Sequence, residues 1–157
     1  MILLVRTEAA REALLRLGVE HVIVTDEGFT DKLGALSAEL RTTAVFDGVG
    51  GDLLGKIIPS LPMSSTVYFY GFLGGTAPVS FPSALFMMRD LTMKRFSNYD
   101  SKTVKQPEKL AAALKALEAV IDDPMFATRI GEEFRYEQIE QAMAYRSPEG
   151  AKAVLLA

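Results

Sequence analysis

The sequence has no cysteine and only one histidine, His21, among its 157 residues. Without cysteine there is no disulfide framework and no thiolate metal site. A single histidine within an apolar strand is more often a packing or surface residue than a ligand, and no second histidine exists to complete a zinc site. The sequence therefore predicts no metal site and no zinc.

Long apolar runs and basic clusters are also missing. The apolar runs have the length of strands, well short of the roughly 20 residues that a membrane span needs, and residues 1–5 are too short for a signal-peptide core. The net charge is −3, and Lys and Arg do not cluster as a nucleic-acid surface would require. We expect a cytoplasmic protein whose partners include neither nucleic acid nor membrane.

What the sequence does contain is an alternation of short β-like runs with helical periods. The expected strands are Ile2 to Val5, His21 to Val24, Thr43 to Phe46, Thr66 to Tyr70, Leu91 to Phe96 and Ala153 to Leu156. Between them, apolar residues recur at helical spacing. Such alternation is typical of crossover units in a mainly parallel α/β sheet. The length and the apolar fraction of 49% suit one domain with a core.

Three residues predict where helices begin or end. Thr7 is a candidate N-cap for the first helix, and Gly18 stands where that helix would end in a left-handed turn. Pro107 lies at the expected first turn of a helix whose apolar stripe includes Leu110 and Leu114. The polar stretch from Ser97 to Gln106 is expected to be a loop.

Candidate binding residues follow the expected strands, because ligands of an open α/β sheet bind outside the carboxyl ends of its strands. These segments are Arg6-Thr7, Thr25-Asp26 and residues 47–51, 71–75 and 96–98. Three of the five are rich in glycine or small residues, which lets backbone approach a flat ligand. The same glycines could equally serve only to make turns.

Four segments occur in an order that resembles a known family. They are residues 15–23 (LRLGVEHVI), 45–51 (VFDGVGG), 66–71 (TVYFYG) and 150–155 (GAKAVL). Together they resemble the nucleotide-binding domain of the medium-chain dehydrogenase/reductase (zinc-type alcohol dehydrogenase-like) superfamily. The zinc-free quinone oxidoreductase and enoyl reductase branch is the most similar. The resemblance covers the whole chain and implies a Rossmann-like, mainly parallel sheet with helices on both faces.

The resemblance also implies that part of the family's structure lies outside the sequence. Ile2 to Val5 would be the second strand of the dinucleotide fold, and no G-x-G-x-x-G occurs anywhere in the chain. We therefore expect residues 1–157 to be a single partial NAD(P)-binding domain, truncated at the N-terminus, with the catalytic domain absent. The first strand is central in the order 3-2-1-4-5-6. Its absence predicts a gap with unpaired strand edges on both sides.

By this resemblance the chain is the cofactor-binding fragment of an NAD(P)H-dependent oxidoreductase. The parent enzyme would transfer hydride between NADPH and a small carbonyl, quinone or enoyl substrate. Arg6, followed by Thr7, stands where an acidic residue would bind the ribose of NAD, so NADP(H) is favoured over NAD(H). The other expected cofactor contacts are Asp47, Val49, Gly50, Tyr70, Gly71, Phe96, Ser97 and Asn98.

Some alternatives remain open at this point. Asp47 could orient a ribose hydroxyl or only cap a turn, and Phe96 could belong to the core. No residue is predicted to be catalytic. A second hypothesis is a non-catalytic dimerisation module, because the region from Val79 to Phe96 is densely apolar and would pair in a homodimer. A third, another nucleotide- or methyl-donor-binding α/β domain, is disfavoured by the match at residues 150–155.

Overall fold

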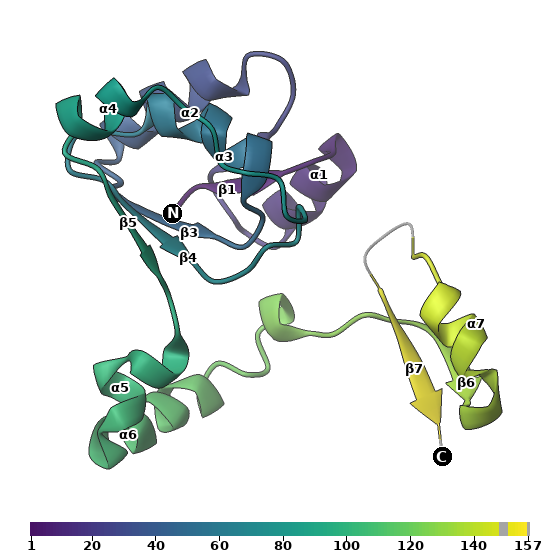
Figure 1. Ribbon diagram of the computed structural model, residues 1–157. Coiled ribbons are helices and arrows are strands. Elements are labelled where there is room, and N and C mark those ends of the chain that lie inside the picture. The colour runs from purple at the N-terminus through teal and green to yellow at the C-terminus, as the bar shows by residue number, and fades with distance from the viewer. Residues whose placement is uncertain (148–150, 157) are drawn as a thin grey trace. The chain divides into compact units, whose positions relative to one another are not determined.

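A computed structural model describes residues 1–147 and 151–156 of the chain (Figure 1). Gly150, which belongs to the last segment of the family resemblance, lies outside these residues. The chain divides into two compact units, residues 1–111 and residues 112–157. Each unit is described by itself below.

Strands and helices alternate along the first unit, as the sequence predicts. The elements are β1 (Leu3–Val5), α1 (Glu8–Arg16), β2 (Val22–Val24), α2 (Phe29–Glu39), β3 (Ala44–Asp47), α3 (Gly51–Ile57), β4 (Thr66–Phe69), α4 (Ser83–Met88), β5 (Thr92–Arg95) and α5 (Lys102–Lys105). Short 3-10 turns follow α3 (Ile58–Ser60) and β5 (Asn98–Asp100). Helix α6 (Pro107–Glu118) begins in this unit and crosses the division.

All strand pairs in the described part of the chain are parallel. In the first unit β1 pairs with β2, while β3, β4 and β5 form a second sheet with β4 in the centre. The register of this sheet places Val45 opposite Val67, and Val67 opposite Met93. The expected α/β fold with a parallel sheet is therefore confirmed.

The expected interruption of the sheet is present between β1 and β3. Among the described residues, β1 has β2 as its only partner, and β3 has β4 as its only partner. One side of each strand is therefore unpaired. Elements on both sides of the interruption nevertheless contribute to one core, which includes Ile23 of β2 and Val67 of β4.

Helices cover both faces of the strands. Helices α2 and α3 lie on one face, where Leu54, Ile58 and Val67 are fully buried. Helix α1 contacts β1 and β2. Val22 is buried but lies outside the core of α2 and α3, whereas its neighbour Ile23 belongs to that core. Since adjacent strand residues point to opposite faces, α1 covers the other side of β2.

The predicted helix ends are confirmed. The Thr7 hydroxyl accepts a hydrogen bond from the N–H of Ala10 at 3.2 Å, which satisfies one free donor at the start of α1. Gly18 has a φ of +85°, a left-handed conformation that glycine adopts without steric cost. Pro107 is the first residue of α6, where its missing N–H removes no helical hydrogen bond.

Two short helices correct the predictions. Helix α5 lies within the stretch from Ser97 to Gln106, which the sequence predicts to be a loop. It forms because the Ser101 hydroxyl caps the N–H of Val104 at 3.1 Å. Helix α4 occupies part of the apolar region from Val79 to Phe96, directly after Pro82. Neither helix exceeds two turns, so neither has a clear apolar period in the sequence.

The second unit contains one parallel strand pair and a helix. Strands β6 (Ile130–Arg135) and β7 (Lys152–Leu156) flank α7 (Ile139–Ala144), with 3-10 turns at Pro124–Phe126 and Tyr136–Gln138. Phe134 is buried, and its ring meets the Tyr145 ring edge to face at a centroid distance of 6.0 Å.

Candidate functional site

The carboxyl ends of β3, β4 and β5 carry most of the predicted site residues. Parallel strands end at the same edge of a sheet, so loops that are distant in sequence meet there. The loop after β3 holds Asp47, Val49 and Gly50, and the loop after β4 holds Tyr70 and Gly71. Phe96, Ser97 and Asn98 follow β5.

Asp47 acts as a cap for the turn after β3. Its side chain is buried, with 7% exposed. One carboxylate oxygen accepts hydrogen bonds from the N–H groups of Val49 and Gly50 at 3.0 and 3.1 Å, and the other oxygen accepts from Gly50 at 3.0 Å. Both oxygens are therefore engaged with the backbone. Of the two roles left open by the sequence, the structure shows the turn cap.

The loops after β3 and β4 are bonded to one another. The carbonyl oxygens of Asp47, Gly48 and Val49 accept hydrogen bonds from the N–H groups of three residues in the second loop, at 2.8 to 2.9 Å; these donors are Tyr70, Leu73 and Gly74. Together with the Asp47 cap, these bonds leave few free polar groups in the backbone of the first loop. A ligand would meet it through van der Waals contact.

Gly48, within the candidate segment 47–51, makes a close contact that the sequence does not predict. A Cβ added there would lie 2.7 Å from the ring of Tyr70. The bare backbone of Gly48 leaves room for the Tyr70 ring where it lies, beside the strand ends. The glycine-rich sequence indicated a turn here, but the partner ring lies more than 20 residues further along the chain.

We expect Asp47→Ala to destabilise the first unit by about 1.5–3 kcal/mol, the usual contribution of hydrogen bonds to a charged group. The exposed Asp52→Ala is the matched control, because that carboxylate lies in the first turn of α3 and accepts no hydrogen bond in the described residues. Urea unfolding followed by circular dichroism measures both. Equal losses in the two variants would contradict the capping role.

A groove of about 620 Å³ lies between the loops after β4 and β5. It brings together five predicted residues from two separate segments: Tyr70, Gly71, Phe96, Ser97 and Asn98. Phe72, from the candidate segment 71–75, also lines it, together with three residues that the sequence does not predict, namely Phe69, Arg95 and Tyr99. Arg95 is the last residue of β5 and forms an ion pair with Asp100. Its position at the end of a strand is the sequence feature that could have identified it as a site residue.

Phe96 is half-buried and lies outside the core of α2 and α3. Its ring packs edge to face on Phe46 at a centroid distance of 5.4 Å and on Tyr68 at 6.3 Å. The residue also lines the groove. The aromatic contacts hold the start of the segment from Phe96 to Asn98 on the sheet, and the remainder of that segment faces the groove.

Arg6 and Thr7 lie at the end of β1, and neither lines this groove. Thr7 is engaged as the N-cap of α1. No hydrogen bond or ion pair of the Arg6 side chain occurs among the described residues, and the residue is exposed. Arg11, in contrast, forms an ion pair with Glu8. Of these two arginines, Arg6 is the one whose guanidinium remains available.

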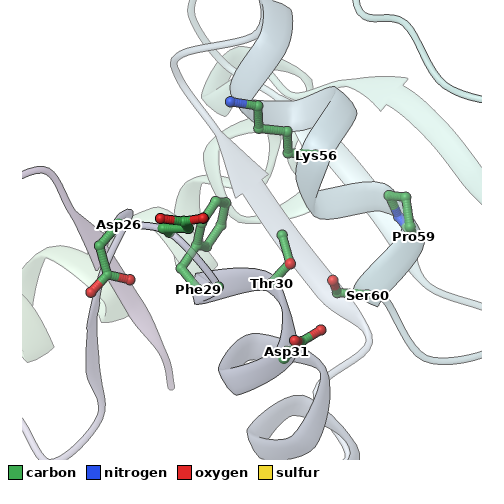
Figure 2. Close-up of a pocket in the computed structure, with 9 residues that line it drawn as sticks. Asp26, Phe29, Thr30, Asp31, Lys56, Pro59 and Ser60 are labelled. Carbon is green, nitrogen blue, oxygen red and sulfur yellow. The ribbon is translucent and has the colours of Figure 1, made fainter.

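A second pocket, of about 530 Å³, lies between the start of α2 and the end of α3 (Figure 2). One wall comes from the loop and first turn of α2, and the other from α3 and the 3-10 turn after it. Three carboxylates, of Asp26, Glu27 and Asp31, line it against one lysine, Lys56. Asp26 also pairs with Lys32 at 3.4 Å. This acidic lining disfavours a phosphate group.

The described residues contain no group of three or more His, Cys, Asp or Glu residues placed to hold a metal ion. Within the same part of the chain, no helix combines the length and the apolar character that a membrane span requires.

Comparison with solved structures gives extensive matches. A mycobacterial protein solved in complex with NADPH superposes with a TM-score of 0.69 at 18% identity, over 99% of this chain and 49% of that one. An NADPH:quinone reductase from Mesorhizobium loti gives a TM-score of 0.77 at 16% identity, over 99% and 45%. A mutant enoyl thioester reductase from Candida tropicalis gives 0.69 at 17%, over 98% and 46%.

The chain shares its fold with these three proteins, two of which are reductases. The expected resemblance to the quinone oxidoreductase and enoyl reductase branch is thereby confirmed at the level of the fold. The chain spans about half the length of these neighbours. No protein-family model matches the sequence, and a search of curated proteins gives no match.

Proposed function

We propose that this chain is the cofactor-binding part of an NADPH-dependent oxidoreductase that acts on a quinone, an enoyl group or another small carbonyl compound. The observation that carries the proposal is the groove at the ends of β4 and β5, which joins two predicted segments in one place. Its support is the fold shared with reductases and with a mycobacterial protein solved in complex with NADPH. In this proposal residues 1–157 are one partial domain of a cytoplasmic enzyme, and the catalytic domain lies outside them.

The groove suits the nicotinamide end of the cofactor. Tyr70 and Gly71 form one wall, where a side chain at Gly71 would be crowded because its Cβ would lie 3.0 Å from the carbonyl oxygen of Gly48. The Ser97 hydroxyl and the Asn98 amide on the other wall can exchange hydrogen bonds with a carboxamide. Bound NADPH would supply the hydride, while these residues hold and orient its ring.

At the other end of the cofactor, Arg6 would bind the 2′-phosphate. An arginine after this strand accommodates a 2′-phosphate, whereas an acidic residue would bind the ribose of NAD. The Arg6 guanidinium has no partner among the described residues, so it can bind a phosphate without losing an ion pair. The acidic pocket of Figure 2 is unsuited to that phosphate. Zinc has no place in this proposal.

In the parent enzyme, we expect Arg6→Ala to weaken NADPH binding selectively, by about 1.5–3 kcal/mol or roughly 10- to 150-fold, because a charge-assisted hydrogen bond is lost. NADH, which lacks the 2′-phosphate, should bind equally to both proteins. Arg11→Ala is the control, since Arg11 already pairs with Glu8. Dissociation constants from ligand-observed NMR measure the ratio. Equal losses for NADPH and NADH would exclude Arg6 as the residue that binds the phosphate.

A second candidate function is a non-catalytic dimerisation module. It is favoured by α4, where Phe86, Met87 and Met88 are exposed. Such an apolar patch on a free surface commonly marks an interface. The predicted homodimer through the region from Val79 to Phe96 depends on this patch.

Cofactor titration and light scattering together separate the two functions. NADPH binding at the groove supports the oxidoreductase, whether or not the chain dimerises. A tight dimer that Met87→Glu dissociates, combined with no NADPH binding at millimolar concentration, would favour the dimerisation module instead. The substitution places a charge on α4 at a residue that is 79% exposed, so a monomer should tolerate it.

A further inference from the structure

Arg95 is the only charged residue among the described residues that line the groove after β4 and β5. Its side chain is 76% exposed, and none of the described lining residues carries a carboxylate. The acidic pocket of Figure 2 has the opposite character. An anionic ligand is therefore attracted to the groove and repelled by that pocket.

The ion pair of Arg95 leaves most of its guanidinium free. The Nη2 atom donates to one carboxylate oxygen of Asp100, whereas Nε and Nη1 form no hydrogen bond in the described part of the chain. The other Asp100 oxygen pairs with Lys105 at 3.4 Å. Two cations thus share one carboxylate, and the three side chains together keep a net positive charge. The remaining donors of the guanidinium can bind a second carboxylate.

Asp100 competes only weakly with a ligand for Arg95. Both side chains are more than half exposed, and exposed ion pairs contribute little stability because water screens them. The guanidinium can therefore turn toward a ligand at small cost.

Aromatic side chains form most of the remaining lining of the groove. They belong to Phe69, Tyr70, Phe72, Phe96 and Tyr99. Flat aromatic faces pack well against other planar, conjugated groups. The lining thus favours a planar ligand, and Arg95 adds a preference for negative charge.

The groove has room for a substrate beside a nicotinamide ring. Its volume of about 620 Å³ lies within the range of sites that hold drug-sized ligands. In the proposed function Ser97 and Asn98 hold the carboxamide of the cofactor. Arg95 and Tyr99 are then left for a second ligand.

We propose that Arg95 makes this groove selective for a planar substrate whose carboxylate is conjugated to a double bond, in place of a neutral quinone. The guanidinium would bind the carboxylate, and the aromatic rings would contact the conjugated part. The inference rests on the proposed oxidoreductase function and narrows its substrate class. Arg95 is in this sense a specificity-determining residue, which acts on the binding and orientation of the substrate.

The test compares cinnamate with cinnamamide, its uncharged analogue, as ligands of the 157-residue chain at low ionic strength. Amide shifts of Ser97, Asn98 and Tyr99 in NMR give both dissociation constants. Cinnamate should bind about tenfold more tightly, because only the carboxylate forms a charged pair with Arg95. Equal affinities for the two ligands, or no cinnamate binding up to its limit of solubility, would overturn the proposal.

Arg95→Gln should abolish this difference while leaving the affinity for cinnamamide unchanged, and an exposed residue tolerates such a change. Lys94→Gln is the matched control. It removes the same charge from the adjacent residue, whose ammonium lies 4.9 Å from the centre of the Tyr68 ring and does not line the groove. A preference for cinnamate that survives Arg95→Gln, or that Lys94→Gln reduces equally, would contradict the role of Arg95.

Titration of the same variants with NADPH separates this inference from the proposed function. Arg95→Gln should leave the affinity for NADPH unchanged, because Arg6 is the residue proposed to bind the phosphate. A selective loss of NADPH affinity would overturn the inference, since Arg95 would then bind a phosphate of the cofactor. A preference for cinnamate without any NADPH binding would reject the cofactor function and still support the carboxylate selectivity of the groove.

Discussion

The purified 157-residue chain is expected to bind NADPH only in the millimolar range and to reduce no quinone. The pyrophosphate of a dinucleotide normally binds to backbone N–H groups of a glycine-rich turn at a helix N-terminus. No G-x-G-x-x-G occurs in the sequence. In the loop after β3, Asp47 already engages the N–H groups of Val49 and Gly50. Each missing charged hydrogen bond weakens binding by about 1.5–3 kcal/mol, and two or three of them turn a micromolar affinity into a millimolar one.

Calorimetry with NADPH measures the affinity, and a quinone reduction assay measures turnover. The heat-killed chain is the control for turnover, and NADH is the control for the contribution of the phosphate. Reduction of quinone also needs a site from which water is excluded, whereas the groove here opens on a surface where Phe72 and Tyr99 are exposed. Micromolar binding or turnover above the control would show that these residues build a complete site in another way.

Leu54→Ala is expected to destabilise the first unit by about 2–5 kcal/mol, as is usual when a fully buried leucine leaves a cavity. The Leu54 side chain is 0% exposed and belongs to the core that α3 shares with α2 and β4. A loss of this size is a large fraction of the stability of a small domain. The core therefore depends on this residue to hold α3, and with it the loop after β3, against the sheet.

The matched control is Leu73→Ala in the loop after β4, where the leucine is 88% exposed and the change should lie within about 0.5 kcal/mol. Urea unfolding, monitored by hydrogen exchange at β4 amides, reports the first unit alone. Equal effects of the two substitutions would contradict the placement of the core.

Much of the fold could be predicted because its signals are local. The strand runs, the Thr7 cap and the left-handed Gly18 each depend on a few adjacent residues. Helix α4 escaped prediction because its one and a half turns are apolar on all sides, and no side chain caps its start. The division after residue 111 was not predicted, because no stretch with the composition of a linker occurs there. That residues 1–157 form a single partial domain stays a prediction.

The candidate site was predictable where it depends on strand ends and unpredictable where it depends on packing. Tyr70 and Asn98 follow strands whose carboxyl ends must share one edge, so their convergence follows from topology. The fit of the Tyr70 ring over Gly48 arises from a contact between two loops, and no local pattern indicates it. Arg95 was missed for a different reason: it lies inside the expected strand rather than after it.

The most direct test of the central claim is a titration of the chain with NADPH, followed by backbone amide shifts in NMR. Such shifts detect even millimolar binding and report its location. The account predicts that Gly71, Ser97 and Asn98 shift together with Arg6, while Ser64 and Ser65 at the opposite ends of the strands stay unchanged. Shifts confined to the acidic pocket around Asp31, or no shifts at millimolar NADPH, would contradict it.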